Sequence, residues 1–201
     1  MAFLNHKTNE IQLKIVYYGP GRSGKTTNLR YIYENFSERL NSKMITINTE
    51  GERTIFFDYF PFDIGEIAGY KVKVQLYTVP GQMKYKSTRR LVLNGIDGVV
   101  FVANAVKSER RRNILSLGDL QKNLRHYQKN IFQIPFVFQY NKLDLTKKGI
   151  PLLSPALLER DLNRQLMRPA YVASAIEGRN VAATLKTIIS MTSQSVTANL
   201  N

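Results

Sequence analysis

A glycine-rich loop between a strand-like run and a helix-like run constrains the fold most. The run Ile11–Tyr18 is apolar and β-rich, and the stretch from about Lys25 to Phe36 is helix-like. Between them, residues 19–26 read Gly-Pro-Gly-Arg-Ser-Gly-Lys-Thr, which matches G-x-x-x-x-G-K-[ST] at every fixed position. The glycines let successive backbone N–H groups curl round a phosphate, and the helix N-terminus adds partial positive charge. The sequence therefore predicts a P-loop on a strand–loop–helix unit.

The residues of this loop are expected to hold the phosphates of a nucleotide. Lys25 is expected to reach the β- and γ-phosphates, and the hydroxyl of Thr26 to ligate Mg²⁺. The other expected contacts come from the loop and the first helical turn: Gly19, Gly21, Arg22, Ser23, Gly24 and Thr27. A glycine-rich turn that matches by chance is the alternative, and the flanking strand and helix argue against it.

Strand-like and helix-like stretches alternate along the rest of the chain. Further strands are predicted at residues 44–47, 56–63, 70–77, 98–103, 136–140 and 170–173, with a turn at 64–69. Further helices are predicted around residues 117–131, at 154–166 with Ser154 as N-cap, and at 180–192. Continuous apolar strands alternating with helices predict an α/β fold, with a mostly parallel, six-stranded-type sheet covered by helices on both faces. We expect one domain over residues 1–201, with its core at about 11–190 and a polar, fraying tail from 192 to 201.

A second motif follows the strand that ends at Tyr140 and predicts the choice of base. It reads Asn141-Lys142-Leu143-Asp144. At the carboxyl edge of an open α/β sheet, the carboxylate of Asp144 can accept hydrogen bonds from guanine N1–H and the 2-amino group. Adenine offers no such pair of donors and would leave the carboxylate desolvated and unpaired. Lys142 can lay its stem over the base; an ordinary polar turn is the alternative.

Three shorter segments have positions that fit the same site. Thr78-Val79-Pro80-Gly81-Gln82 ends a predicted strand, so that Gly81 N–H can contact the γ-phosphate and Gln82 can orient the attacking water. Arg53-Thr54 lies between the first helix and the strand from Phe56, where Thr54 can close on Mg²⁺ and Arg53 can neutralise transition-state charge. Ser174-Ala175 follows the last strand and can present a backbone N–H to guanine O6. The alternatives are a simple Pro-Gly turn for the first segment, a solvated loop arginine for the second and a strand-end turn for the third.

Composition limits the chemistry and the partners. The chain has no cysteine, which excludes disulfides and thiolate sites and fits a reducing cytoplasm. No apolar run is long enough to span a bilayer, so we expect no integral membrane association. The net charge is +14. Between Met83 and Val137, three acidic residues (Asp97, Glu109 and Asp119) oppose eleven basic ones: Lys84, Lys86, Arg89, Arg90, Lys107, Arg110, Arg111, Arg112, Lys122, Arg125 and Lys129. This predicts either an acidic partner protein or a solvated face, and no motif indicates nucleic-acid binding.

Together these motifs resemble the Ras superfamily of small GTPases over residues 11–190. The narrower resemblance is to the bacterial MglA family of polarity and motility GTPases. It is carried by the P-loop with its flanks, by Arg53-Thr54, by Leu76–Gln82, by Gly98–Ala103 and by Gln139–Lys142. Thr78 stands where most Ras-like proteins have an aspartate, and a threonine there is typical of the MglA family. Arg22-Ser23 departs from the hydrophobic-Cys pair of its motility members.

The resemblance implies a Ras-like G domain that binds GTP or GDP with Mg²⁺ and hydrolyses GTP slowly. It implies that Arg53 is an arginine finger supplied in cis, that an MglB-like roadblock-type protein stimulates hydrolysis, and that effectors read the GTP state. It also implies a cytoplasmic protein recruited to a cell pole. Asp58, and less so Asp63, is a candidate to replace the carboxylate missing at Thr78. A P-loop metabolic enzyme and a non-hydrolysing GTP-binding scaffold are the alternative functions.

Overall fold

The computed structural model describes residues 3–5, 8–40, 45–47, 57–67, 69–81 and 85–198. Within these ranges the strands are β1 (Phe3–Asn5), β2 (Glu10–Tyr18), β3 (Ile45–Ile47), β4 (Phe57–Ile67), β5 (Tyr70–Thr78), β6 (Gly98–Asn104), β7 (Phe136–Asn141) and β8 (Ala170–Val172). The α-helices are α1 (Lys25–Leu40), α2 (Lys86–Leu93), α3 (Arg110–His126), α4 (Pro155–Leu158) and α5 (Val181–Thr197). Short 3₁₀ turns at Lys107–Glu109 and Leu143–Lys148 and a π-helical stretch at Glu159–Asn163 complete the described elements.

The strands form one mixed sheet, whose described part has eight strands in the order β3-β4-β5-β2-β6-β7-β8, with β1 paired to β2. Strands β5, β2, β6, β7 and β8 run parallel, and β4 is antiparallel to β5. β1 and β3 are antiparallel additions of three residues each. The predicted mostly parallel sheet of six-stranded type is therefore confirmed: it consists of β4, β5, β2, β6, β7 and β8, of which five run parallel.

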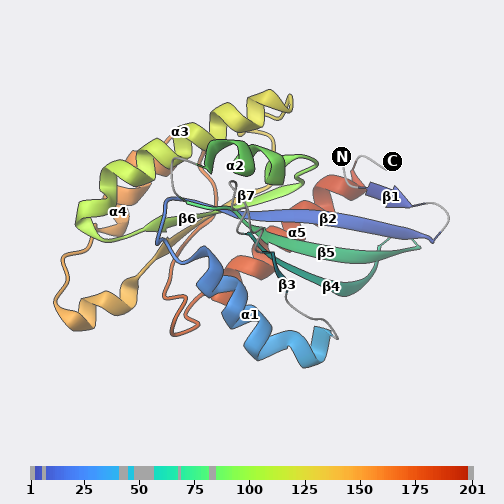
Figure 1. Cartoon of the computed structure of the whole chain (residues 1–201), viewed down its shortest axis with the longest axis horizontal. Helices are drawn as coiled ribbons and strands as arrows, with labels where there is room; N and C mark the ends of the chain where they lie inside the picture. Colours follow the sequence, from blue (N-terminus) through green and yellow to red (C-terminus); the bar gives the residue numbers. More distant parts are fainter. Residues whose placement is uncertain are drawn as a thin grey trace.

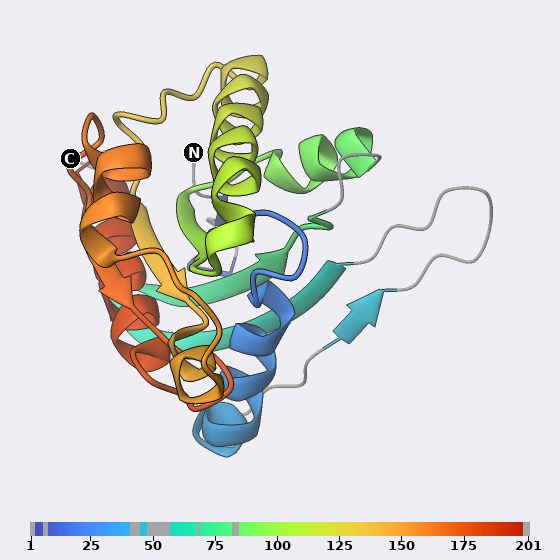
Figure 2. The same cartoon turned by 90° about the vertical axis from the view of Figure 1, so that its left-hand side faces the viewer.

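Helices cover both faces of this sheet, as predicted (Figures 1 and 2). On one face, α2 and α3 pack on the sheet through Leu93, Leu120 and Leu124. On the other face, α1 and α5 pack through Leu29, Ile32 and Ile188. Because both faces are covered, every residue of the central strands β6 and β7 is buried, which explains why their sequences are mostly apolar.

The helix predicted around residues 117–131 lies earlier in the chain, because part of its inner face is polar. α3 begins at Arg110 and ends at His126. Asn113 is buried in its first half, where its side chain donates to Asn104 O at 2.8 Å and accepts from Asn104 N at 2.9 Å. A search for apolar residues at spacings of three and four does not detect a helical turn whose buried residue is polar.

The two other helices differ from the prediction in different ways. Helix α2 was not predicted. Ser154 is confirmed as the N-cap of α4, which is shorter than predicted, and its Oγ accepts a hydrogen bond from Leu157 N.

The predicted turn at residues 64–69 is largely part of the hairpin instead. β4 continues to Ile67 with a register shift between Asp63 and Glu66. Gly65 lies at this irregularity with a φ of +103°, a conformation that glycine adopts without strain, so the strands stay paired beyond it.

The predicted fraying tail was also wrong over residues 192–197, which belong to α5. Thr192 is fully buried, and its Oγ1 donates to Ile188 O at 2.7 Å. It fits against the sheet because Gly98 has no side chain: a Cβ there would lie 2.4 Å from Thr192 Oγ1. Among the described helices, none combines the length and apolar character needed to cross a membrane.

A pair of buried amides fixes the P-loop helix to the sheet. Asn28 of α1 and Gln139 of β7 exchange two hydrogen bonds of 2.8 and 3.0 Å, and both side chains are fully buried. Gln139 Nε2 also donates to Thr184 Oγ1 of α5 at 3.3 Å. Three elements therefore meet at one polar contact in an otherwise apolar layer.

Replacing Gln139 by leucine should therefore destabilise the fold. Gln139→Leu leaves Asn28 Oδ1 buried without its donor, which should cost about 1–3 kcal/mol of unfolding free energy. Urea unfolding would measure the loss. The control is Gln121→Leu on the half-buried part of α3, which should change stability by about 0.5 kcal/mol or less. Equal effects of the two substitutions would contradict the importance of the buried pair.

Candidate nucleotide-binding site

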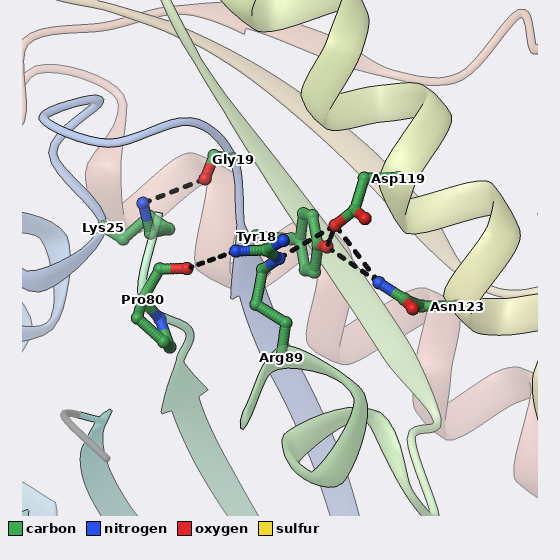
Figure 3. Close-up of polar contacts among 7 residues, drawn as sticks. All are labelled: Tyr18, Gly19, Lys25, Pro80, Arg89, Asp119 and Asn123. Carbon is green, nitrogen blue, oxygen red and sulfur yellow. Dashed lines mark hydrogen bonds and ion pairs between the residues drawn. The ribbon is translucent and has the colours of Figure 1, made fainter. Parts of the chain in front are cut away.

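The loop between β2 and α1 closes on its own lysine. Lys25 Nζ donates to the carbonyl oxygen of Gly19 at 3.0 Å (Figure 3) and to that of Pro20 at 2.7 Å. The side chain is nearly buried. The loop carbonyls thus hold the ammonium group against the loop.

The backbone of the loop can form only with glycine at two positions. Gly19 and Gly24 have φ values of +145° and +102°. A Cβ at Gly19 would lie 2.2 Å from Val102 O, and one at Gly24 would lie 2.2 Å from Asn141 Nδ2. Both the conformation and the lack of space therefore demand glycine. Arg22 also has a left-handed φ, of +60°, and its side chain is exposed.

Asn141 joins the phosphate loop to the segment after the last strand. Its Nδ2 donates to Ser23 O at 2.7 Å, and its Oδ1 accepts from Ala175 N at 2.8 Å. Asn141, Ser23 and Ala175 are all buried. The structure therefore brings two of the predicted segments together through one side chain, although they lie more than a hundred residues apart in the sequence.

The rest of the predicted base motif lies beside this contact. Lys142 has a left-handed φ of +88°, which turns the chain from β7 into a 3₁₀ helix that begins at Leu143. Asp144 lies in the first turn of that helix, and its Oδ1 accepts from Ser174 Oγ at 2.8 Å. Ser174 is buried, whereas Asp144 and Lys142 are half-buried. The contact with Ser174 fixes the orientation of the carboxylate and leaves its second oxygen for another donor.

The end of β5 lies against the phosphate loop. A Cβ on Gly81 would lie 2.4 Å from Gly21 N, so the two backbones are in close approach. Thr78 is buried. Tyr59 of β4 pairs with Tyr77, which places Asp58, the preceding residue, at the level of Thr78. Asp63 pairs with Lys73 instead, farther along the hairpin from Thr78.

A cavity of about 1000 Å³ opens beside these segments. Predicted residues that line it are Gly21, Arg22, Gly24, Lys25, Thr26, Thr27, Gly81 and Lys142. Arg53, Thr54 and Gln82 fall outside the described residues. The lining also includes residues that sequence analysis did not assign to a site: Pro20, Arg30, Thr78, Val79, Pro80, Tyr85, Arg89, Arg112, Leu115, Ser116 and Asp119.

Two of the unassigned residues form an ion pair. Arg89 Nε lies 2.8 Å from Asp119 Oδ2, and the Arg89 side chain is only 3% exposed. Sequence analysis counted Arg89 among the surface cations, which the structure corrects. The pairing depends on α2 lying against α3, and no local pattern in the sequence reports that contact.

Comparison with known proteins identifies the family. A model of the Ras family matches residues 14–194. The mutual gliding-motility protein MglA of Myxococcus xanthus (strain DK1622) is 44% identical over 189 residues, which cover 94% of each chain. The Ras-related protein Rab-9A, from both Canis lupus familiaris and Homo sapiens, is 25% identical over 173 residues, covering 85% of this chain and 77% of Rab-9A. The chain therefore belongs to the Ras family and is an MglA-like small GTPase, a switch that binds and hydrolyses GTP.

Proposed function

We propose that this single-domain GTPase regulates cell polarity and gliding motility by binding partner proteins in its GTP state. The observation that carries the proposal is the 44% identity to the gliding-motility protein MglA, which extends over 94% of the chain. The threonine at position 78 agrees with it, because this is the position at which the MglA family departs from most Ras-like proteins. The test is to delete the gene in its own organism and to score polarity and gliding.

The geometry of the loop supports a role for Lys25 and Thr26 at the phosphates. Thr26 is exposed in the first turn of α1 and lines the cavity beside Lys25. The described residues contain no group of three His, Cys, Asp or Glu side chains that could hold a metal. Mg²⁺ keeps several waters and binds few protein ligands beside the nucleotide phosphates. We assign Thr26 and Thr54 as its protein ligands; when bound, the ion neutralises phosphate charge.

Thr26→Asn should therefore lose Mg²⁺-dependent GTP binding. The longer amide removes the hydroxyl ligand and crowds the first helical turn. Titration of nucleotide affinity against Mg²⁺ concentration would show wild-type affinity rising with Mg²⁺, and that of the variant staying flat. Thr187→Asn, on α5 and outside the cavity, is the control. Wild-type Mg²⁺ dependence in Thr26→Asn would exclude the role given to this hydroxyl.

The second part of the proposal is guanine recognition by the Asn141–Asp144 motif. The Ser174 hydroxyl already orients Asp144, and the free carboxylate oxygen suits the N1–H and 2-amino donors of guanine. Lys142 lines the cavity and can cover the base. Ala175 N–H donates to Asn141 Oδ1, so a bond from Ser174-Ala175 to guanine O6 would have to share or exchange that donor.

Asp144→Asn should change the base preference. The amide presents a donor that suits the 2-oxo group of xanthine, so xanthine nucleotides should gain affinity and GTP should lose about 2–4 kcal/mol. Competition titrations with GTP and xanthosine triphosphate would measure both. Asp161→Asn, which removes a carboxylate beside Arg110 and outside the cavity, should leave base preference unchanged. Wild-type GTP affinity in Asp144→Asn would refute the assignment.

The third part concerns hydrolysis. We assign Gln82 to orient the attacking water, Gly81 to contact the γ-phosphate and Arg53 to cover the charge of the transferring phosphoryl group. Catalysis of phosphoryl transfer is nearly all positioning and electrostatic stabilisation. An MglB-like activator that holds these segments in place would speed hydrolysis without inserting a residue of its own.

Arg53→Ala and Gln82→Leu should each remove most of the stimulation by such an activator. Arginine fingers contribute about 10³–10⁵ in rate, so the loss should be large while GTP affinity stays near wild type. Single-turnover hydrolysis with and without the activator measures it, with the exposed Arg164→Ala as control. If the activator fully stimulates Arg53→Ala, the activator supplies its own catalytic residue and the cis finger is refuted.

The partners that we propose beyond the activator are acidic effector proteins. Arg111, Lys122 and Arg125 are exposed along α3, and the upper surface of this helix is turned away from the sheet (Figure 1). Opposite charge on an effector would steer its approach and fix its orientation. We further propose a cytoplasmic protein that partners recruit to a cell pole. Fluorescence microscopy of a tagged chain would test this, and uniform distribution in both nucleotide states would contradict it.

A further inference from the structure

One carboxylate oxygen joins three parts of the fold beside the phosphate loop. Asp119 Oδ2 accepts from Tyr18 OH at 2.5 Å, from Arg89 Nε at 2.8 Å and from Asn123 Nδ2 at 3.2 Å. Tyr18 is the last residue of β2, directly before the loop; Arg89 belongs to α2; Asn123 lies one turn further along α3. Figure 3 shows the three donors converging on Asp119.

The cluster is largely buried, at the edge of the cavity. Tyr18 and Asn123 are fully buried, and the side chains of Arg89 and Asp119 are 3% and 12% exposed. Burial raises the pKa of Tyr18, so its hydroxyl stays protonated and acts as a donor. Arg89 is always charged. Since the carboxylate is the acceptor for every one of these groups, it holds them in a single arrangement.

Arg89 extends this arrangement to the end of β5. Its Nη1 lies 3.5 Å from Pro80 O, while its Nε contacts Asp119 (Figure 3). The next residue, Gly81, is in close backbone approach to Gly21 of the phosphate loop. The planar guanidinium can face both acceptors because its donors point in fixed, different directions. A displacement of Arg89 would therefore move the segment that faces the phosphates.

We propose that Arg89 and Asp119 are positioning residues for GTP hydrolysis. The pair fixes the Val79-Pro80-Gly81 turn against the phosphate loop, and thereby sets the fraction of time for which Gly81 N–H is correctly placed for the γ-phosphate. The proposal rests on the γ-phosphate role that we assign to Gly81, and it is independent of any activator. It predicts a cost to the hydrolysis rate and to GTP binding relative to GDP, since GDP lacks the phosphate that this turn faces.

The decisive variant is Arg89→Lys in the full chain without activator. Lysine keeps the charge, but it has one nitrogen in place of the planar guanidinium whose Nε and Nη1 face Asp119 and Pro80 at the same time. Single-turnover GTP hydrolysis should slow about tenfold, because small displacements of positioning groups have large effects on rate. The ratio of GTP to GDP affinity should fall about as much, with GDP affinity changing by less than about twofold. Arg164→Lys, an exposed arginine that does not line the cavity, should behave as wild type.

A second variant separates positioning from general stability. Asp119→Asn removes the charge that holds Arg89, and the double variant should be no slower than the slower single one, because both act through one contact. Thermal unfolding with bound GDP is measured for every variant. The proposal is overturned if Arg89→Lys hydrolyses GTP at the wild-type rate, if GTP and GDP affinities fall equally in step with stability, or if the two effects are additive. These rates are measured without an activator, and each variant is compared with the wild-type chain under the same conditions. A failure of the activator to stimulate hydrolysis would therefore refute the activator proposal without affecting the test of Arg89 and Asp119.

Discussion

The amide of Asn141 fixes the shape of the phosphate loop, and the rest of the site is arranged around it. It donates to the loop at Ser23 O and accepts from Ala175 N, and both bonds are buried, where water cannot replace a lost partner. Position 24 requires glycine, because this amide occupies the space that a Cβ would take. A ring of backbone N–H groups binds a phosphate well only if it does not have to reorganise on binding, and this contact supplies that rigidity.

The same strand fixes the helix behind the loop. Gln139 and Asn141 are two residues apart in β7, so their side chains lie on the same face of the sheet. Gln139 holds Asn28 of α1, and Asn141 holds the loop from which α1 begins. One face of one buried strand therefore positions the helix, the phosphate loop and the segments proposed to recognise the base together.

Positive charge has different roles in different parts of the molecule. Arg89 is buried and paired with Asp119 next to the phosphate loop, so its charge stabilises a contact inside the protein. Arg110 and Arg112 are exposed but lie beside Asp161 and Glu109, where such surface pairs contribute little to stability. Arg111, Lys122 and Arg125 remain as exposed cations on α3. The net charge of +14 is thus partly internal and partly a surface feature suited to acidic partners.

By itself the sequence determined the architecture and the site motifs, because both depend on local order. The alternation of apolar strands with helices predicts a covered parallel sheet, and the fixed residues from Gly19 to Thr26 impose the loop, since only glycine tolerates its backbone. Only the tertiary structure decided where polar groups are buried. The extent of α3 depends on the bond between Asn113 and Asn104, the end of α5 on the space above Gly98, and the burial of Arg89 on Asp119. Each of these is a contact between different elements of the fold. The sequence around a polar side chain does not show which partner will offset the cost of burying it.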